Sequence, residues 1–462
     1  MNSTTTTANP LGFEPVGKLM LKFSIPGIIS LVINSLYNMV DQIFIGQGVG
    51  YLGNAATNVV LPMVVVLLAL GLMIGDGTAA YMSLNLGMKK PEEAAKGVGN
   101  AITAIIACGV VLLIVFQIFL VPLCNLFGAT KDSLPYCIEY GRIILIGFPV
   151  SIMGCGLGGL IRADGRPKQS MAGLVLGCVT NIVLDAIFVL VLDWGVAGAA
   201  WATIIGQALC AVYYIICLTK FKTITLKKSY FIPKFAVLKR TCTLGLASFI
   251  NQAAAVVIII VINNAMVIYG AQSIYGPDIP LAAFGITAKV NQLVSSIIIG
   301  IGGGTQPILG FNYGSEQYDR VKQCFKKSLL IGIIIMAVSW AVFQLFPDQI
   351  LLMFGQESDL YMDFARKSLR IYNLFLFLMP FGCLTGMFFQ AIGKPISASF
   401  LSLLRQIILS IPLALIFGHF FGVVGVLWSM ACADALSCLI SLIVLKTRWG
   451  KIFPVKQTLE NN

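Results

Sequence analysis

Long apolar stretches recur along the whole chain, and short segments rich in Gly, Pro and charged residues separate them. A transmembrane helix needs about 20 consecutive, mostly apolar residues. Twelve stretches meet this requirement, so the pattern predicts an all-α membrane protein with twelve transmembrane helices. We place these helices at residues 23–46, 55–82, 95–121, 135–160, 169–192, 196–218, 243–270, 280–307, 323–346, 363–388, 396–418 and 422–445.

Three short motifs occur twice, in the same order and at nearly the same spacing. A glycine-rich segment, a Gly-basic-Pro turn and a segment ending in Trp each return after 227 or 228 residues. Three such matches in one order indicate an internal repeat. The paired segments are Gly75–Gly87 with Gly302–Gly314, Gly165–Pro167 with Gly393–Pro395, and Gly195–Trp201 with Gly422–Trp428.

The repeat divides the chain into two lobes of six helices each. We predict an N-terminal lobe at 1–218, a basic cytoplasmic linker at 219–242, and a C-terminal lobe at 243–462 that ends in a short basic tail. Because six is an even number, both lobes enter the membrane from the same side. We therefore expect a pseudo-two-fold axis along the membrane normal and a functional cavity between the lobes, near the midplane.

The composition agrees with lipid as the main solvent. Of the 462 residues, 58% are hydrophobic and only 11% are charged, whereas soluble domains carry roughly 25% charged residues. The formal charge of +12 would suggest nucleic acid in a soluble protein, but 24 of the 31 Lys and Arg lie at the termini, in the linker and in alternate loops. Cytoplasmic loops collect such residues. We expect a multi-pass protein of the plasma (inner) membrane with both termini in the cytoplasm, in contact with lipid and not with nucleic acid.

The residues that most enzymes require are scarce. None of the twelve Cys has C-x-x-C spacing, and His419 is the only histidine, which argues against zinc sites and Ser-His or Cys-His pairs. No phosphate-binding loop is present, so we expect no cofactor and take an ion gradient as the energy source. A duplicated twelve-helix chain is typical of alternating-access transporters, and we predict a transporter, not an enzyme.

An acid lies near the outer end of the first predicted helix. Asp41 follows Asn34 and Asn38 at spacings that place all three on one helix face, with Tyr37 beside them. Burial and hydrogen bonding tune the proton affinity of such an acid in opposite directions. This suits reversible binding of a proton or a sodium ion, and the alternative is an acid that is simply solvated at the membrane boundary.

A second acid lies within the fifth helix. Asn181 and Asp185 are four residues apart and share a face, and Thr203 offers a hydroxyl in the sixth helix. Amide and carboxylate oxygens are hard ligands, as sodium or a proton relay requires, whereas a Thr hydroxyl commonly bonds its own helix backbone. Ionisable groups within membrane helices are costly and are therefore functional candidates. The alternative for Asp185 is a hydrogen bond between helices within the lobe.

The sequence does not decide the roles of several other residues in the predicted helices. Asp76 and Asp434 can serve packing, gating or the substrate, and Lys289 and Arg405 can reach the interface, pair with an acid or line the cavity. Pro26 removes a backbone hydrogen bond early in the first helix. It is a candidate hinge, and an ordinary kink is the alternative.

The chain resembles the multidrug and toxic compound extrusion (MATE) family, in its DinF-like or MepA-like bacterial branch. The resemblance covers nearly the whole chain, including the repeat. It is carried by the segments Ile25–Gly27, Tyr37–Gly46, Gly165–Pro167, Asn181–Asp185 and Gly195–Trp201.

The resemblance implies export of amphipathic, often cationic drugs in exchange for H⁺ or Na⁺. It implies a cation site formed by Asp41, Asn181, Asp185 and Thr203, and a bend at Pro26 when Asp41 changes protonation. Candidate residues of the substrate cavity are Asn34, Tyr37, Asn38, Tyr140, Gln252, Asn263 and Lys289.

The second lobe departs from some branches of the family, which carry acids in its cavity. Here Asn263 and its neighbours are neutral, so we expect coupling to be concentrated in the first lobe. A flippase for lipid-linked precursors in the same superfamily is the nearest alternative, but it would need more cavity cations than Lys289 and Arg405. A membrane-embedded enzyme or receptor is the alternative from another class. Nothing in the chain requires more than a monomer.

Overall fold

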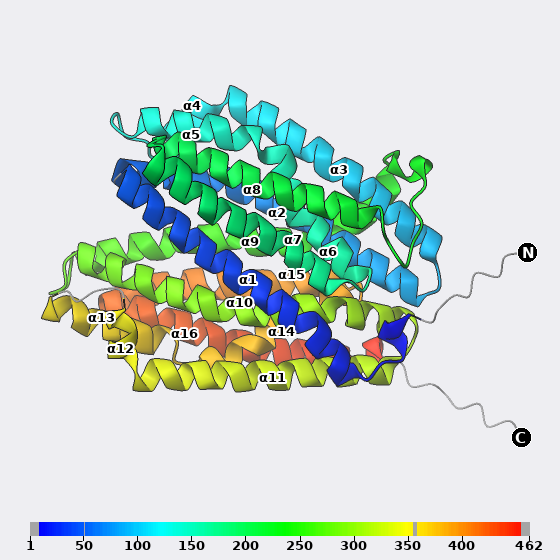
Figure 1. Ribbon diagram of the computed structural model, residues 1–462. Coiled ribbons are helices and arrows are strands. Elements are labelled where there is room, and N and C mark those ends of the chain that lie inside the picture. Colours follow the sequence, from blue (N-terminus) through cyan, green and yellow to red (C-terminus); the bar gives the residue numbers. More distant parts are fainter. Residues whose placement is uncertain (1–8, 50, 354–357, 454–462) are drawn as a thin grey trace, which may run out of the picture. The chain divides into compact units, whose positions relative to one another are not determined.

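The computed structural model describes residues 9–49, 51–353 and 358–453, and within these ranges the chain forms helices joined by short loops, without a strand (Figure 1). The two ends of the chain, including Lys456 of the basic tail, lie outside the described residues. All-helical structure is expected in lipid because a helix satisfies its own backbone hydrogen bonds.

The described residues of the first half form eight α-helices and three short segments of other helical type. Two of these segments are 3-10 turns, and the third is a π-helix that continues α7 without a break. The bounds are η1 (Pro10–Gly12), α1 (Val16–Gly48), α2 (Tyr51–Gly87), α3 (Pro91–Ile118), α4 (Leu120–Leu126), α5 (Leu134–Ile146), α6 (Phe148–Ala163), α7 (Pro167–Asp185), η2 (Ala186–Val191), α8 (Gly195–Leu218) and η3 (Lys228–Phe231).

The second half repeats this plan. The bounds are α9 (Phe235–Gly270), α10 (Asp278–Gly314), α11 (Tyr318–Leu345), α12 (Pro347–Leu352), α13 (Asp359–Tyr372), η4 (Leu376–Leu378), α14 (Met379–Ala391), α15 (Pro395–Leu403), η5 (Leu404–Leu409) and α16 (Ser410–Ile452).

The predicted helix at 135–160 is broken in the structure. α5 and α6 meet at Gly147 with a bend of 56°. Pro149 lies in the first turn of α6, where a backbone N–H would have no partner within the helix. Within one continuous helix the same proline would remove a backbone hydrogen bond and its ring would clash with the preceding turn, so the chain breaks here. At Gly147 an added Cβ would lie 2.5 Å from the Ile204 side chain, so α8 packs directly against the break.

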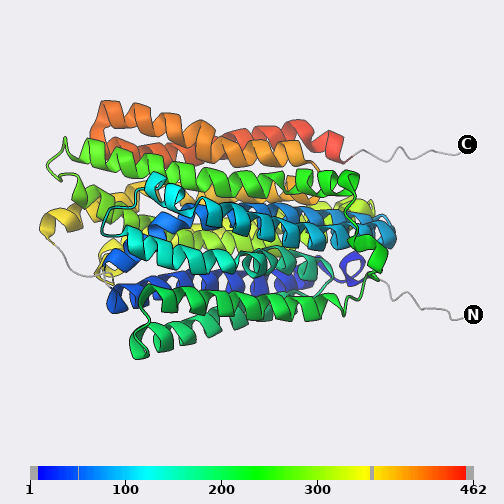
Figure 2. The same cartoon turned by 90° about the horizontal axis from the view of Figure 1, so that it is seen from above.

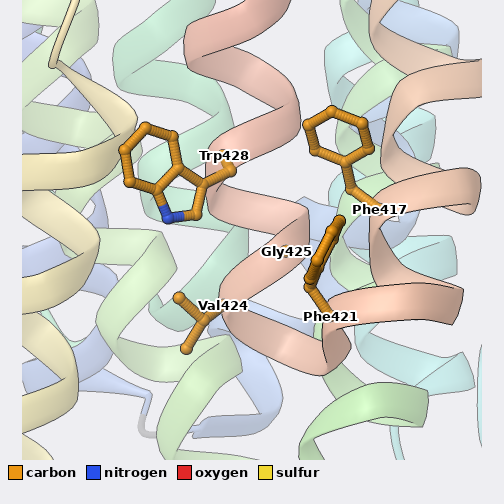
Figure 3. Close-up of a pocket in the computed structure, with 5 residues that line it drawn as sticks. All are labelled: Phe417, Phe421, Val424, Gly425 and Trp428. Carbon is orange, nitrogen blue, oxygen red and sulfur yellow. The ribbon is translucent and has the colours of Figure 1, made fainter.

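The last apolar region is a helical hairpin. The residues from Pro395 to Ile452 are helical for 58 residues, but Gly422 interrupts them with φ 63° and ψ −153°. One span needs only about 20 residues, so the break separates the two predicted helices 396–418 and 422–445. Figure 3 shows the two arms of this hairpin and an apolar pocket of about 440 Å³ beside the turn. It is lined by Phe417, Phe421, Val424, Gly425 and Trp428.

The described helices therefore account for the predicted spans. Ten are long and apolar enough to cross a membrane, the bent pair α5–α6 forms another, and the break at Gly422 divides one of the ten. The chain is a multi-pass membrane protein.

The helices form two compact units that do not coincide with the two halves of the sequence. Unit 1 comprises the described residues up to Val256 together with Gln292–Gln317 and Met387–Ser399. Unit 2 comprises Val257–Asn291, Tyr318–Gly386 and the described residues from Phe400 onward. The core of unit 1 lies among α2, α3, α5, α6 and α8, and that of unit 2 among α9, α10, α13 and α16.

Glycines bring α10 close to α1 within unit 1. A Cβ added at Gly300 would lie 2.7 Å from the Ile28 Cα, and one added at Gly304 would lie 2.6 Å from the Ser24 Cα. The glycine-rich segment of α10 is thus a helix-packing surface, as small residues are in membrane proteins.

Side chains of unit 1 hold the basic segment after α8. The Asp164 carboxylate accepts hydrogen bonds from Arg166 Nε at 2.6 Å, from the Thr223 backbone N–H at 2.9 Å and from Thr223 Oγ1 at 2.6 Å. Farther along, Asn100 Nδ2 donates to the Tyr230 carbonyl at 3.0 Å. The segment is therefore packed against α3 and the end of α6.

Candidate ion-coupling site

Close packing of α7 against α8 positions two of the predicted polar residues. A Cβ added at Gly206 would lie 2.6 Å from the Gly177 carbonyl oxygen, so only glycines allow this approach. One turn beyond Gly177, Asn181 Nδ2 donates a hydrogen bond to Thr203 Oγ1 at 3.2 Å. Asn181 is 2% exposed.

The adjacent helix α1 completes the site. It runs beside α7 (Figure 1 and Figure 2), and this contact brings Asp41 to Asp185. Their two carboxyl groups lie close enough to interact electrostatically. Asp185 is fully buried, and Asp41 is partly buried. The structure therefore brings together Asp41, Asn181, Asp185 and Thr203, as the sequence predicts.

Several oxygen atoms at this site have no donor. Within the described part of the chain, no N–H or hydroxyl group donates a hydrogen bond to the buried atoms Asp41 Oδ1, Asp185 Oδ1, Asp185 Oδ2 or Asn181 Oδ1. Buried acceptors without a donor are unfavourable. A proton between the carboxyls, or a cation among the oxygens, would satisfy them, so these residues fit a coupling cation.

Two phenols lie beside the acid pair. Tyr37 from α1 and Tyr140 from α5 both interact electrostatically with Asp41 and Asp185. Tyr140 is 8% exposed. A tyrosine hydroxyl can donate as well as accept a hydrogen bond, so these side chains are placed to follow a change of charge on the carboxyls.

The other polar side chains of α1 bond or contact nearby residues of α1 and α7. Asn38 Nδ2 donates to the Asn34 carbonyl at 2.7 Å, and the Asn34 side chain contacts Cys178 on α7. Pro26 is buried within α1, and its carbonyl accepts a hydrogen bond from Ser30 Oγ at 2.7 Å. The helix continues through the proline, and a hinge at this position stays a prediction.

The remaining predicted cavity residues belong to other helices. Gln252 is on α9 in unit 1, and both Asn263 and Lys289 belong to unit 2. Lys289 is exposed. No described contact joins these three residues to the acid pair, so the cavity that they would share with it stays a prediction.

Asp76 joins helices within unit 1. Its carboxylate accepts a hydrogen bond from Ser248 Oγ at 3.0 Å and lies 3.9 Å from Arg162 Nη2. Gln390 Nε2 donates in turn to Ser248 Oγ at 3.0 Å. The contacts link α2 with α6, α9 and α14, so the carboxylate has a packing role that sequence reasoning left open.

Arg405 and Asp434 form an ion pair in unit 2. Arg405 Nε donates a hydrogen bond to Asp434 Oδ1, which settles the pairing of two charges whose roles the sequence leaves open. Opposite charges in the last two predicted helices are the only sequence signal for this contact.

A π-helical turn follows Asp185 directly. η2 begins at Ala186, so the acid lies where α7 changes its winding. Such turns often occur at functional sites. Sequence reasoning missed this feature, since the residues Ala186–Val191 are ordinary apolar ones.

These helices and their buried acid pair define a transporter-like membrane protein, and solved structures identify its fold. The chain superimposes on the crystal structure of a MATE transporter in complex with MaL6 with a TM-score of 0.90 and 24% identity, covering 98% of this chain and 100% of the other. A multidrug resistance MATE family transporter of the MOP superfamily, in an outward-facing conformation, gives a TM-score of 0.90 at 24% identity, covering 96% and 98%. The predicted class, twelve helices in two lobes, is confirmed.

The family model MatE matches residues 26–187 and 253–416, and the chain therefore belongs to the MatE family of transporters. A curated relative is the multidrug export protein MepA of Staphylococcus saprophyticus, 27% identical over 436 residues, which are 93% of each chain. The resemblance to the MepA-like branch is confirmed.

Proposed function

We propose that this protein exports amphipathic, often cationic drugs in exchange for protons by alternating access. The observation that carries the proposal is the pair of carboxyls on α1 and α7, where three carboxyl oxygens and Asn181 Oδ1 lack a donor. The relatives named multidrug export proteins support the drug as the exported substrate.

Two adjacent carboxylates favour binding of a single proton. When both Asp41 and Asp185 are charged, their repulsion in a low-dielectric site is strong, and one proton held between them removes it. Binding of the proton thus changes the force between α1 and α7. A ligand shifts a conformational equilibrium only through different affinities for the two states, and this pair supplies such a difference if its separation changes between them.

A sodium ion is the alternative for the same site. Asp41, Asn181, Asp185 and Thr203 offer hard oxygen ligands, and sodium would be co-substrate in the same exchange. We favour the proton because the two carboxyls interact electrostatically, and a proton bound by either one would relieve their repulsion.

The orientation and assembly belong to the same proposal. The excess of Lys and Arg in alternate loops supports a protein of the plasma membrane with both termini in the cytoplasm. We propose two functional lobes, residues 1–218 and 243–462, that act within a monomer surrounded by lipid. Transport, without catalysis or a bound cofactor, is the activity.

The test is export of a fluorescent cationic dye from vesicles that contain the purified protein, under a proton gradient alone and under a sodium gradient alone. We expect export under the proton gradient, with loss in Asp41→Asn and Asp185→Asn. Asp193→Asn is the matched control, because Asp193 is exposed beyond η2 and its φ of 52° suits asparagine.

Export driven only by sodium would replace the proton with sodium at this site. Export at the unmodified rate in both site variants would contradict the role of the acid pair. Absence of export under either gradient, from folded protein, would contradict the transport of drugs.

A further inference from the structure

We propose that Arg405 recognises an acidic group, a carboxylate, on amphipathic substrates of this transporter. The proposal rests on the function proposed above and assigns part of its substrate specificity to one side chain in unit 2. It concerns the ion pair that Arg405 forms with Asp434, far along the chain from the acid pair on α1 and α7.

The ion pair uses only part of the guanidinium. Arg405 lies on the π-helical segment η5, and its Nε donates to Asp434 Oδ1 on α16. A guanidinium carries five N–H donors in a planar fork. Within the described residues, the Arg405 side chain donates no other hydrogen bond, so the terminal nitrogens are open for a second acceptor.

The two partners differ in accessibility. The Arg405 side chain is 30% accessible, whereas that of Asp434 is only 6% accessible. The acid is thus enclosed, whereas the terminal nitrogens of Arg405 are accessible. Asp434 fixes the orientation of the guanidinium and leaves the ligand-binding end exposed.

The open end lies near two other side chains of unit 2. Arg405 lies deep in unit 2, near Tyr372 and Cys383, and these two side chains are also partly accessible. Open N–H donors that faced lipid tails would be costly. The accessible donors therefore border a space that water or a ligand can enter, with the Tyr372 ring at its side.

The geometry fits a carboxylate better than other groups. One guanidinium can bind two carboxylates, because Nε and the terminal nitrogens lie on different edges of the plane. A bidentate contact to the terminal pair is the preferred geometry of arginine with a planar oxyanion. A cationic group would be repelled by the same end of the side chain.

A purely structural ion pair is the competing interpretation, and it makes a different prediction. If Arg405 only holds η5 against α16, its loss weakens the fold and lowers transport of every substrate equally. If Arg405 contacts substrate, its loss affects only substrates that carry an acid.

The test uses two matched probes, a rhodamine with a free carboxylate and the methyl ester of the same dye. Vesicles contain the full chain or a variant, and export of each dye is measured. The main variant is Arg405→Gln combined with Asp434→Asn, because it leaves no buried charge without its partner. Arg405→Lys is the second variant, because it keeps the charge and the pair but removes the fork.

We expect the double variant to lose about tenfold in export efficiency for the acid, the loss expected for one charge-assisted contact, and to stay within twofold for the ester. Arg405→Lys should lose a smaller factor for the acid alone. Equal losses for both dyes, or no loss for either, would overturn the proposal. If the double variant does not fold, the ratio of acid to ester export in Arg405→Lys decides. Failure of the unmodified protein to export the ester would instead contradict the proposed function itself.

Discussion

Replacing Asp164 with asparagine tests how much the Asp164 carboxylate, which holds the segment after α8, contributes to the free energy of unfolding. The Asp164 side chain is fully buried, and Arg166, its ion-pair partner at 2.6 Å, is only 9% accessible. The same carboxylate accepts bonds from the Lys222 and Thr223 backbone N–H groups and from the Thr223 hydroxyl. An asparagine amide keeps one acceptor oxygen but replaces the other with an NH2 group, which cannot accept these hydrogen bonds. The substitution also leaves Arg166 without its counter-charge.

The cost follows from the loss of the charge. Removing one partner of a buried pair costs about 3–5 kcal/mol, and hydrogen bonds to a charged group contribute about 1.5–3 kcal/mol each. These contributions overlap, and Arg166 keeps its bond to the Cys217 carbonyl at 2.8 Å. We therefore expect Asp164→Asn to lower the free energy of unfolding by about 3–5 kcal/mol.

Thermal unfolding of the purified protein in detergent measures this loss. For a domain of about 150–250 residues, one kcal/mol shifts Tm by about 2–4 °C. Unit 1 is larger, so the shift per kcal/mol is smaller, and we expect a decrease in the apparent Tm of up to about 10 °C. Asp132→Asn removes an exposed carboxylate and serves as the control. A decrease in Tm for Asp164→Asn no larger than that of the control would contradict the stabilising role of the Asp164 carboxylate.

Two further substitutions probe packing around the helices. Thr203→Val removes the acceptor of Asn181 Nδ2, so we expect a loss of about 1–3 kcal/mol of stability and weaker proton-driven dye export. Thr203→Ser keeps the acceptor and should keep both the stability and the export. Equal Tm values and equal export in the two variants would contradict this expectation. Gly245→Ala places a Cβ 2.6 Å from the Met73 carbonyl carbon, and we expect a cost of about 1–3 kcal/mol from overpacking. Gly303→Ala is the control, since no described heavy atom would lie within 4 Å of its Cβ, and a similar decrease in Tm for both would argue against close approach of α9 and α2.

Hydropathy predicts the helices well because each span must be long and apolar on its own. It misses the break at Gly147, since the apolar run continues through it and only Pro149, two residues later, signals the bend. The hairpin at Gly422 is easier to predict, because the repeat places a glycine turn there.

The site is harder to predict because it depends on contacts between distant helices. Spacing places Asn181 and Asp185 on one face of α7, but the rotation and height of α1 against α7 decide whether Asp41 reaches them. Tyr140 lies in an ordinary apolar segment, and only the resemblance to the MATE family made it a candidate. The pairing of Arg405 with Asp434 likewise needs the packing of η5 against α16.

The most direct test of the account is release of protons when drug binds to the purified protein. In weakly buffered detergent solution with a pH indicator, we expect a cationic dye to release protons from the unmodified protein and from Asp193→Asn, and to release none from Asp185→Asn that still binds the dye. Dye binding without proton release from the unmodified protein, or equal release from Asp185→Asn, would contradict the claim that the carboxyls on α1 and α7 hold the coupling proton.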